Sequence, residues 1–397
     1  MRITQSLNQT QFLTALNTLE SSLSQTQNQL SSNLSFTTAS QNPTAAGAVN
    51  NYNQALAQSQ QYTTNASSAQ TNLNIEDSTL SQVQSQLQSL RDLALQANSG
   101  TLTNTNRAAI AAQAVQIQNS LLSLANTTNG NGEYIFGGFA VQTQPFSASA
   151  TGATYHGDQG SRQVQIAAGQ SVADGDNGNA VFNQIKTGNG TFTVTSKANN
   201  TGSGLIGATS VSNPGAFVGG PFIINFSLPA NYTVTNAANV QVTAGTYTDG
   251  QAIAFSGAQV TLSGTPATGD SFSVAPSTNQ SLFTTVQNLI TSLQSGVTTG
   301  ASNTALSNSI GNSINNIDQA LAQTSNVRAT IGGRLNAITT QQSVSSAQQV
   351  QLKTTISSLQ GLDYATAITT LDQQNTTLSA ALQAYSLTQN LTLFKYL

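Results

Sequence analysis

The fold of this chain is decided by its last segment, residues 361–397, which reads GLDYATAITTLDQQNTTLSAALQAYSLTQNLTLFKYL. Apolar residues recur there at alternating steps of three and four, and Asn375 occupies one step of the series. This spacing is typical of a helix that packs along a narrow heptad seam against another helix. The predicted seam residues are Ile368, Leu371, Leu378, Leu382 and Tyr385.

The first segment of the chain carries the matching pattern. Its apolar residues follow the same alternation, and two polar residues, Thr26 and Asn33, take positions within it. A narrow seam at each end of one chain is best covered by the other seam, so we predict that the two terminal helices pair as a coiled coil. The seam residues of the first helix are Leu16, Leu19, Leu23 and Leu30.

Composition excludes several classes of function. Only 6% of the 397 residues are charged, about a quarter of the usual share, and the net charge is -3. No basic stripe is present that could bind a nucleic acid or an anionic membrane surface. Cysteine is absent, so no disulfide is expected. The first residues contain no apolar run typical of a cleaved signal peptide, and no segment is long enough for membrane insertion.

Three helices are predicted before residue 130. The first covers residues 7–34. Asn42 suits the N-cap and Pro43 the first turn of a second helix, which ends before the Asn-Ser-Gly sequence at 98–100. A third helix follows and ends at the Asn-Gly-Asn-Gly sequence at 129–132. The second helix has a seam at Leu73, Leu80, Val83, Leu87, Leu90, Ala94 and Ala97.

The middle of the chain changes to a period of two. Residues 133–139 are aromatic and strand-like, and short β-prone runs punctuated by Gly, Asn, Pro and Asp then recur to about Val274. No charged side chain occurs between Ala198 and Thr248. This gap is typical of a β surface coated with Ser, Thr and Asn, with an adhesive face as the alternative. Helical patterns return near Asn279 and continue to the last segment.

The order of elements predicts an α+β multidomain fold, in which the N- and C-terminal helices pair and an all-β domain is inserted in the middle. We expect a terminal coiled-coil axial segment from residues 1–42 and 361–397. Residues 43–165 and 278–360 are expected to form a helical-bundle rod with a β-hairpin, and residues 166–277 an outer all-β domain.

Candidate catalytic and metal-binding groups are sparse. His156 is the only histidine, and no cysteine is available to share a metal or to act as a nucleophile. The sequence at 174–178, Asp-Gly-Asp-Asn-Gly, resembles a calcium loop, but glycine falls at the fifth position and no Glu stands at the twelfth. The Gly-x-Gly-x-x-Gly match at 202–207 is followed by no helix. We therefore predict no enzyme activity, no cofactor and no metal.

Several motifs resemble the bacterial flagellin family. These are the paired-terminus plan, the Asn-Pro break at 42–43 and the Leu-Asp-Tyr-Ala sequence at 362–365 before a leucine seam. The sequence GEYIFGGF at 132–139, the Gln-Pro-Phe at 144–146 and the ending LTLFKYL at 391–397 are similar to the hook–filament junction branch of that family, the hook-associated protein 3 family. The resemblance covers about residues 1–182 and 280–397, and the middle shows nothing specific to the family.

The resemblance implies a structural protein of the bacterial flagellum that joins hook to filament. It implies extracellular location after type III export without a cleaved signal, a homo-oligomer in a ring or helical layer, and a neighbouring hook-associated protein and flagellin as partners. It also implies an export chaperone on the C-terminal segment. The nine seam residues of the two terminal segments are then the expected subunit interface. Flagellin itself is the alternative, and a surface adhesin or phage fibre is a third.

Overall fold

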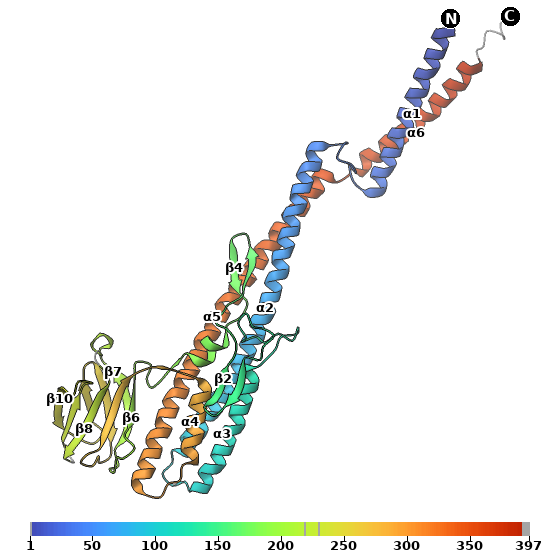
Figure 1. Cartoon of the computed structure of the whole chain (residues 1–397). Helices are drawn as coiled ribbons and strands as arrows, with labels where there is room; N and C mark the ends of the chain where they lie inside the picture. The colour runs from blue at the N-terminus through green and yellow to red at the C-terminus, as the bar shows by residue number, and fades with distance from the viewer. Residues whose placement is uncertain (1, 218–219, 229–230, 391–397) are drawn as a thin grey trace, which may run out of the picture. The chain divides into compact units, whose positions relative to one another are not determined.

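The computed structural model describes residues 2–217, 220–228 and 231–390. It divides into a terminal unit, Met1–Thr64 with Gln341–Leu397, and a central unit, Asn65–Thr340. The fold mixes helix and sheet, as predicted, with helices at both ends of the chain and a β domain in the middle (Figure 1). The helices are α1 (Arg2–Ser32), α2 (Pro43–Ala97), α3 (Asn104–Ala125), α4 (Leu282–Gln294), α5 (Gly300–Gln360) and α6 (Tyr364–Asn390).

The start of α2 follows the local chemistry of its sequence. The side-chain Oδ1 of Asn42 accepts a hydrogen bond from the backbone N–H of Ala45 at 3.1 Å. Pro43 occupies the first helical position, where its missing N–H leaves no internal hydrogen bond unmade. The predicted cap and helix start are both confirmed.

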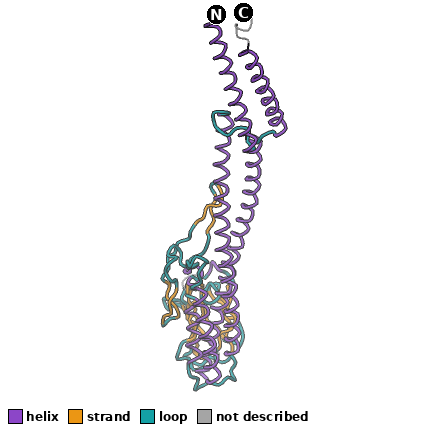
Figure 2. Tube along the Cα trace, turned by 90° about the vertical axis from the view of Figure 1, so that its right-hand side faces the viewer, coloured by secondary structure: helices purple, strands orange, loops and turns teal. Residues whose placement is uncertain are grey.

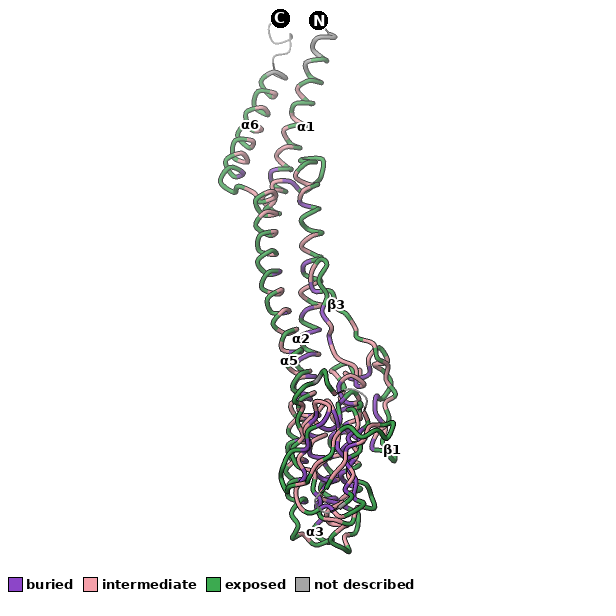
Figure 3. The backbone as a smooth tube through the Cα atoms, turned by 90° about the vertical axis from the view of Figure 1, so that its left-hand side faces the viewer, coloured by how far each residue is buried: buried purple, intermediate pink, exposed green. Residues whose placement is uncertain are grey.

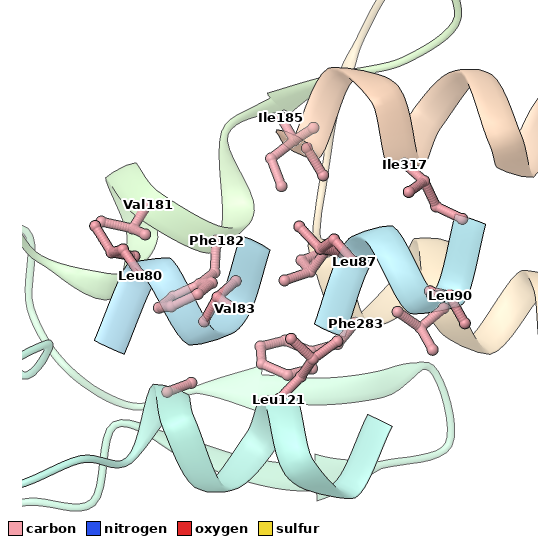
Figure 4. Packing of buried hydrophobic residues seen from close by; sticks show 14 of the residues in the cluster. Leu80, Val83, Leu87, Leu90, Leu121, Val181, Phe182, Ile185, Phe283 and Ile317 are labelled. Atoms are coloured by element: carbon pink, nitrogen blue, oxygen red, sulfur yellow. The ribbon is translucent and has the colours of Figure 1, made fainter. Parts of the chain in front are cut away.

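The core of the central unit is built on the predicted seam of α2. All seven seam residues are buried, with exposed fractions between 0% and 2%. Residues from α3, α4 and α5 cover them and belong to the same continuous core. Figure 4 shows Leu87 among these side chains, with Phe283 of α4 and Ile185 nearby. The seam prediction for α2 is confirmed.

A β-hairpin closes one side of this bundle. It pairs strand β1 (Phe146–Ser149) with β2 (Gly152–Tyr155) in antiparallel register. Phe146 from the hairpin lies 5.2 Å, centroid to centroid, from Phe283 of α4, and 5.5 Å from Phe182. Edge-to-face and tilted ring contacts of this kind are favourable beyond their buried area. A second hairpin follows, β3 (Gln163–Ala167) with β4 (Gln170–Ala173).

Ion pairs hold α2 to α5 within the central unit. Arg328 of α5 pairs with Asp77 of α2 at 2.8 Å, and its guanidinium also donates to Gln84 at 2.9 Å. Further along, Arg91 of α2 pairs with Asp318 of α5 at 2.6 Å. These contacts fix the antiparallel register of the two long helices over their apolar seam.

The inserted β domain is a sandwich of two antiparallel sheets. The larger sheet has the order β10-β9-β8-β13-β6 and the smaller β11-β12-β7. Inward residues of both sheets form a second core, in which the rings of Phe222 and Phe255 lie 5.3 Å apart. The strands are β6 (Phe192–Ser196), β7 (Leu205–Val211), β8 (Phe222–Leu228), β9 (Asn231–Thr235), β10 (Gln241–Thr246), β11 (Ala252–Phe255), β12 (Ala258–Ser263) and β13 (Ser271–Pro276).

The chain enters and leaves this domain through one short ribbon. Strand β5 (Ile185–Lys186) pairs with β14 (Asn279–Gln280), which brings the two ends of the insertion together. The buried side chain of Asn308 on α5 accepts from the N–H of Ile206 at 2.8 Å and donates to the carbonyl of Gly204 at 3.0 Å. A helix amide therefore satisfies backbone groups of the sandwich.

The strand-like interpretation of residues 133–139 is wrong. One isolated bridge joins Tyr134 to Thr128, and residues 135–139 are turn and bend. The carboxylate of Asp158 accepts from the N–H of Phe139 at 2.9 Å, and Gly138 adopts a φ of +70° beside it. The segment buries Phe136 in the core. A turn can bury this ring as well as a strand can, so the aromatic composition did not require a strand. The three-part division at residues 42, 165, 277 and 360 stays a prediction.

Replacing Leu87 with alanine tests the central core. The side chain is 0% exposed, so Leu87→Ala should lower the free energy of unfolding by ~2–5 kcal/mol through lost burial and a residual cavity. Urea unfolding of the full chain measures this change. Leu95→Ala is the matched control on the same helix, because Leu95 is 48% exposed, and it should change stability by less than about 0.5 kcal/mol. Equal losses in both variants would contradict the assignment.

Candidate assembly interface on the terminal helices

Helices α1 and α6 of the terminal unit lie side by side, as Figures 1 and 2 show. The ring of Phe12 on α1 stacks on Tyr385 of α6, with centroids 4.8 Å apart and planes inclined by 9°. Gln9 donates a hydrogen bond to the Tyr385 hydroxyl at 3.4 Å. These contacts join residues that are more than 370 positions apart in the sequence.

The face that α1 turns toward α6 follows the predicted alternation. Four predicted residues on this face are half-buried, namely Leu16, Leu19, Leu23 and Leu30. Thr26, at the polar step of the series, is 6% exposed and its hydroxyl donates to the carbonyl of Ser22 at 3.0 Å. Because that hydroxyl is satisfied within its own helix, it needs no partner across the pair.

The face of α6 is shifted by part of a turn from the predicted one. Leu371, Leu378 and Tyr385 are half-buried, but Ile368 and Leu382 are 43% and 49% exposed and lie on the neighbouring row of the helix. The covered row retains steps of four and three and consists of Ala367, Leu371, Gln374, Leu378, Ala381 and Tyr385. Two of the five predicted α6 residues are thus free to contact something other than α1.

One buried polar group opposes the pairing of the terminal helices. Gln374 lies on the covered row, and its Oε1 is buried without a hydrogen-bond partner among the described residues. An unsatisfied buried acceptor costs about 1–3 kcal/mol. Thr26 and Ala367 are the residues of α1 and α6 that are buried, among those whose exposure is described. Among these residues no leucine or isoleucine is fully buried, so the pair gains less from apolar burial than the seam of α2 does.

Apolar side chains also remain exposed on both helices, which Figure 3 shows as mostly exposed or half-buried. The exposed apolar residues are Leu7, Leu13, Tyr364, Ile368, Leu382 and Leu387, with exposed fractions of 43% to 67%. Six large apolar side chains on these two helices are thus available for contact with a partner. Among residues 6–32 of α1 and 364–387 of α6, the charged side chains are Glu20 and Asp372.

Two loops that lead into these helices are joined to each other. Leu34 and Gly361 form an antiparallel bridge, and the N–H of Ser35 donates to the carbonyl of Gln360 at 2.8 Å. A Cβ at position 361 would collide with the carbonyl oxygen of Ser357, so glycine is required there. The Phe36 side chain, 5% exposed, anchors the longer loop.

The Leu-Asp-Tyr-Ala sequence has a local structural role that the sequence analysis missed. Asp363 accepts from the N–H groups of Ala365 at 3.1 Å and Thr366 at 3.3 Å, and from the Thr366 hydroxyl at 2.9 Å. It is the N-terminal cap of α6. The hydroxyl and N–H of Thr366 lower the pKa of this carboxyl below its ordinary value of 3.8. The available signal was an Asp five residues before Ile368, where the helical period begins.

Comparison with known families supports this arrangement of elements. Residues 3–140 match the family model of the bacterial flagellin N-terminal helical region, and residues 314–397 match the flagellin C-terminal helical region. Residues 195–276 match the D2-like domain of flagellar hook-associated protein 1. The prediction that the middle carries nothing specific to the family is therefore wrong. Residues 391–397, which carried part of the resemblance, lie outside the described residues.

Comparison with individual proteins indicates the family more narrowly than the family models do. Flagellar hook-associated protein 3 of Salmonella typhimurium is 34% identical over 157 residues, 40% of this chain and 49% of that protein, so the match spans about half the relative's length. The crystal structure of FlgL from Xanthomonas campestris is 33% identical, with a TM-score of 0.72, over 77% of this chain and 99% of that one. The flagellar junction protein FlgL from Legionella pneumophila is 32% identical, with a TM-score of 0.68, over 72% and 98%.

The fold and these matches define a flagellin-like structural protein of the bacterial flagellum. Within that class, the chain belongs to the hook-associated protein 3 (FlgL) family. Within the described residues, no helix is long and apolar enough to cross a membrane.

The Asp363 cap predicts an acid-dependent loss of order at the start of α6. Because the folded-state pKa is lowered, the cap stabilises the helix above the ordinary pKa of 3.8 and is lost as pH falls through the lower folded value. Asp363→Ala should remove this dependence and speed amide exchange at Ala365 and Thr366 several-fold at neutral pH. Hydrogen exchange by NMR measures both effects. Asp372→Ala, an exposed change within the same helix, should leave those amides unchanged.

Proposed function

We propose that this chain is the adapter subunit between hook and filament, and that it assembles through its terminal helices. Similarity to junction proteins over 72–77% of the chain carries this proposal. A structural role without catalysis agrees with the relatives, which are flagellar structural proteins. Location in the extracellular flagellum, reached by type III export, belongs to the same proposal.

The proposed mechanism is completion of a partly covered helix pair by neighbouring copies. Helices α1 and α6 pair as a coiled coil, and the nine predicted interface residues have two roles: seven shape the pair within one chain, and two contact adjacent subunits directly. Leu16, Leu371 and their seam partners cover each other within the chain, while Ile368 and Leu382 face adjacent subunits. Full burial of one leucine or isoleucine contributes about 1.5–3 kcal/mol, so half-exposed side chains contribute about half of that each. Several such contacts per copy suffice for a ring or helical layer.

The other parts of the chain have separate proposed roles. Residues 1–42 and 361–397 are the axial segment, residues 43–165 and 278–360 the bundle, and residues 166–277 the outer domain. The proposed partners are further copies of this chain, a neighbouring hook-associated protein and flagellin. An export chaperone would cover the C-terminal segment before assembly, because its exposed apolar side chains would otherwise associate.

The second candidate function is that of flagellin, the filament subunit. It is favoured by the flagellin models that match both termini. Both functions use the same terminal helices and differ in where growth stops.

Electron microscopy of purified protein incubated with hook fragments or filament seeds tests the proposal. The adapter function predicts binding to the hook end that stops after a short zone, because the next layer requires a different subunit. Growth into long filaments from either seed would make the chain a flagellin. Binding to neither seed would contradict both functions and favour an adhesin.

A charge on the covered row of α6 should separate export from assembly. Leu378→Asp places a carboxylate against α1, which costs several kcal/mol in the assembled state but nothing in an unfolded exported chain. We expect normal secretion and loss of incorporation, measured by immunoblotting the medium and the purified flagella. Thr376→Asp is the control, because Thr376 is exposed and lies on the side of α6 opposite Leu378, off the row of Ile368 and Leu382. Normal incorporation of Leu378→Asp would remove the seam assignment.

A further inference from the structure

A cluster of four carboxylates lies inside the central unit, apart from the terminal helices. Glu76 comes from α2, Glu133 from the turn segment, and Asp174 and Asp176 from the chain after β4. All four line one small cavity of about 30 Å³, together with Arg162. Glu76 is 1% exposed, in the middle of an otherwise apolar helix face. We call this set the carboxylate cluster.

Three members of the carboxylate cluster have cationic or amide partners. Asp176 makes a two-pronged pair with Arg334 of α5, with both N–O distances at 2.9 Å. Asp174 pairs with Arg162 at 2.7 Å. Glu133 accepts from the Asn129 amide at 3.0 Å and lies 3.6 Å from Arg162.

The fourth member, Glu76, is satisfied on one oxygen only. Its Oε1 accepts from the backbone N–H of Asp176 at 3.3 Å. Its Oε2 is buried, borders the cavity and has no hydrogen-bond partner among the described residues. A cavity of about 30 Å³ has room for one water molecule. An ionised carboxylate with one weak hydrogen bond would be costly at this depth.

The charge balance of the carboxylate cluster also favours a neutral Glu76 side chain. Four carboxylates face two guanidinium groups, so full ionisation leaves a surplus of two negative charges. Asp174 and Asp176 each form an ion pair with an arginine, whereas Glu76 forms no ion pair among the described residues. A proton on Glu76 removes one surplus charge and turns Oε2 from an unsatisfied acceptor into a donor toward the cavity.

We propose that Glu76 holds a proton in the folded protein. This proton stabilises the contact of α2 with the Asp174–Asp176 segment and, through Arg334, with α5. Loss of the proton places an unpaired negative charge beside Asp176 and weakens that contact. The stability of this contact within the central unit therefore depends on pH. It is independent of the assembly proposed for the terminal helices.

A metal ion is the competing occupant of the cavity. The oxygens of Asp174 and Asp176 are already held by guanidinium groups. Among the described residues, no three His, Cys, Asp or Glu side chains are placed to hold a metal. The geometry therefore favours a proton, and added cations become an arm of the test.

The sign of the pH effect follows from the environment of Glu76. Burial, and next the charge of Asp176, raise the pKa of this carboxyl well above its ordinary 4.5, against the opposing effect of Arg334. The folded state then binds one proton more than the unfolded state between the two pKa values. The stabilising effect is complete below pH 4.5 and is lost as pH rises through the folded pKa.

Urea unfolding of the full chain, at pH values from about 5 to about 9, compares the natural protein with Glu76→Gln. Relative to the variant, the unfolding constant of the natural protein should rise about tenfold per pH unit until the folded pKa is reached. Glutamine keeps the shape and a donor without titrating. Glu133→Gln, a change at a less buried member of the carboxylate cluster, should retain the pH dependence.

Identical pH profiles for the natural protein and Glu76→Gln would overturn the proposal. So would a stabilisation by added calcium chloride at alkaline pH that Glu76→Gln abolishes, because a cation would then occupy the cavity. If Glu76→Gln fails to fold, the side-chain carboxyl carbon of Glu76 in the natural protein is followed by ¹³C NMR. A protonated chemical shift at pH 6 supports the proposal, and an ionised shift overturns it.

Discussion

The central unit depends on the pairing of α2 with α5 over a continuous apolar seam. Leu73 through Ala97 bury one face of α2, and α3, α4 and the hairpins add side chains to the same core. The ion pairs at Asp77 and Arg91 set the register of the two helices, since they join residues well over 200 positions apart. Within the central unit, the inserted sandwich is attached to this pair through β5 and β14 and through Asn308 of α5.

The helices of the terminal unit differ from the central unit in their ion pairs and in the residues that they bury. The five ion pairs among the described residues all belong to the central unit, and the terminal helices bury only small or polar residues completely. A bundle with a buried apolar core is thus combined with a helix pair that leaves large apolar side chains such as Leu387, 67% exposed, uncovered. Under the proposed mechanism, such side chains gain burial from neighbouring copies.

Periodic features of the fold could be predicted from the sequence, and features set by tertiary contacts could not. The α2 seam was predictable because seven spaced apolar residues leave a single face to bury. The row on α6 was shifted because Ala367 and Gln374 carry no strong apolar signal, while Ile368 and Leu382 do. Residues 133–139 have strand composition, yet Asp158 and a glycine at positive φ hold them as turns. The environment of the unpaired Glu76 oxygen is formed by a segment 100 positions away in the sequence, so no local sequence pattern could predict it.

The ribbon of β5 and β14 has a consequence for how such chains diversify. Because the two strands close the entrance to the sandwich, residues 187–278 can change in size without altering the ends that the bundle must accommodate. The flagellin models match on either side of this segment, and a different domain model matches within it. The ribbon is therefore a point at which one inserted domain could replace another while the helical bundle that carries it keeps its structure.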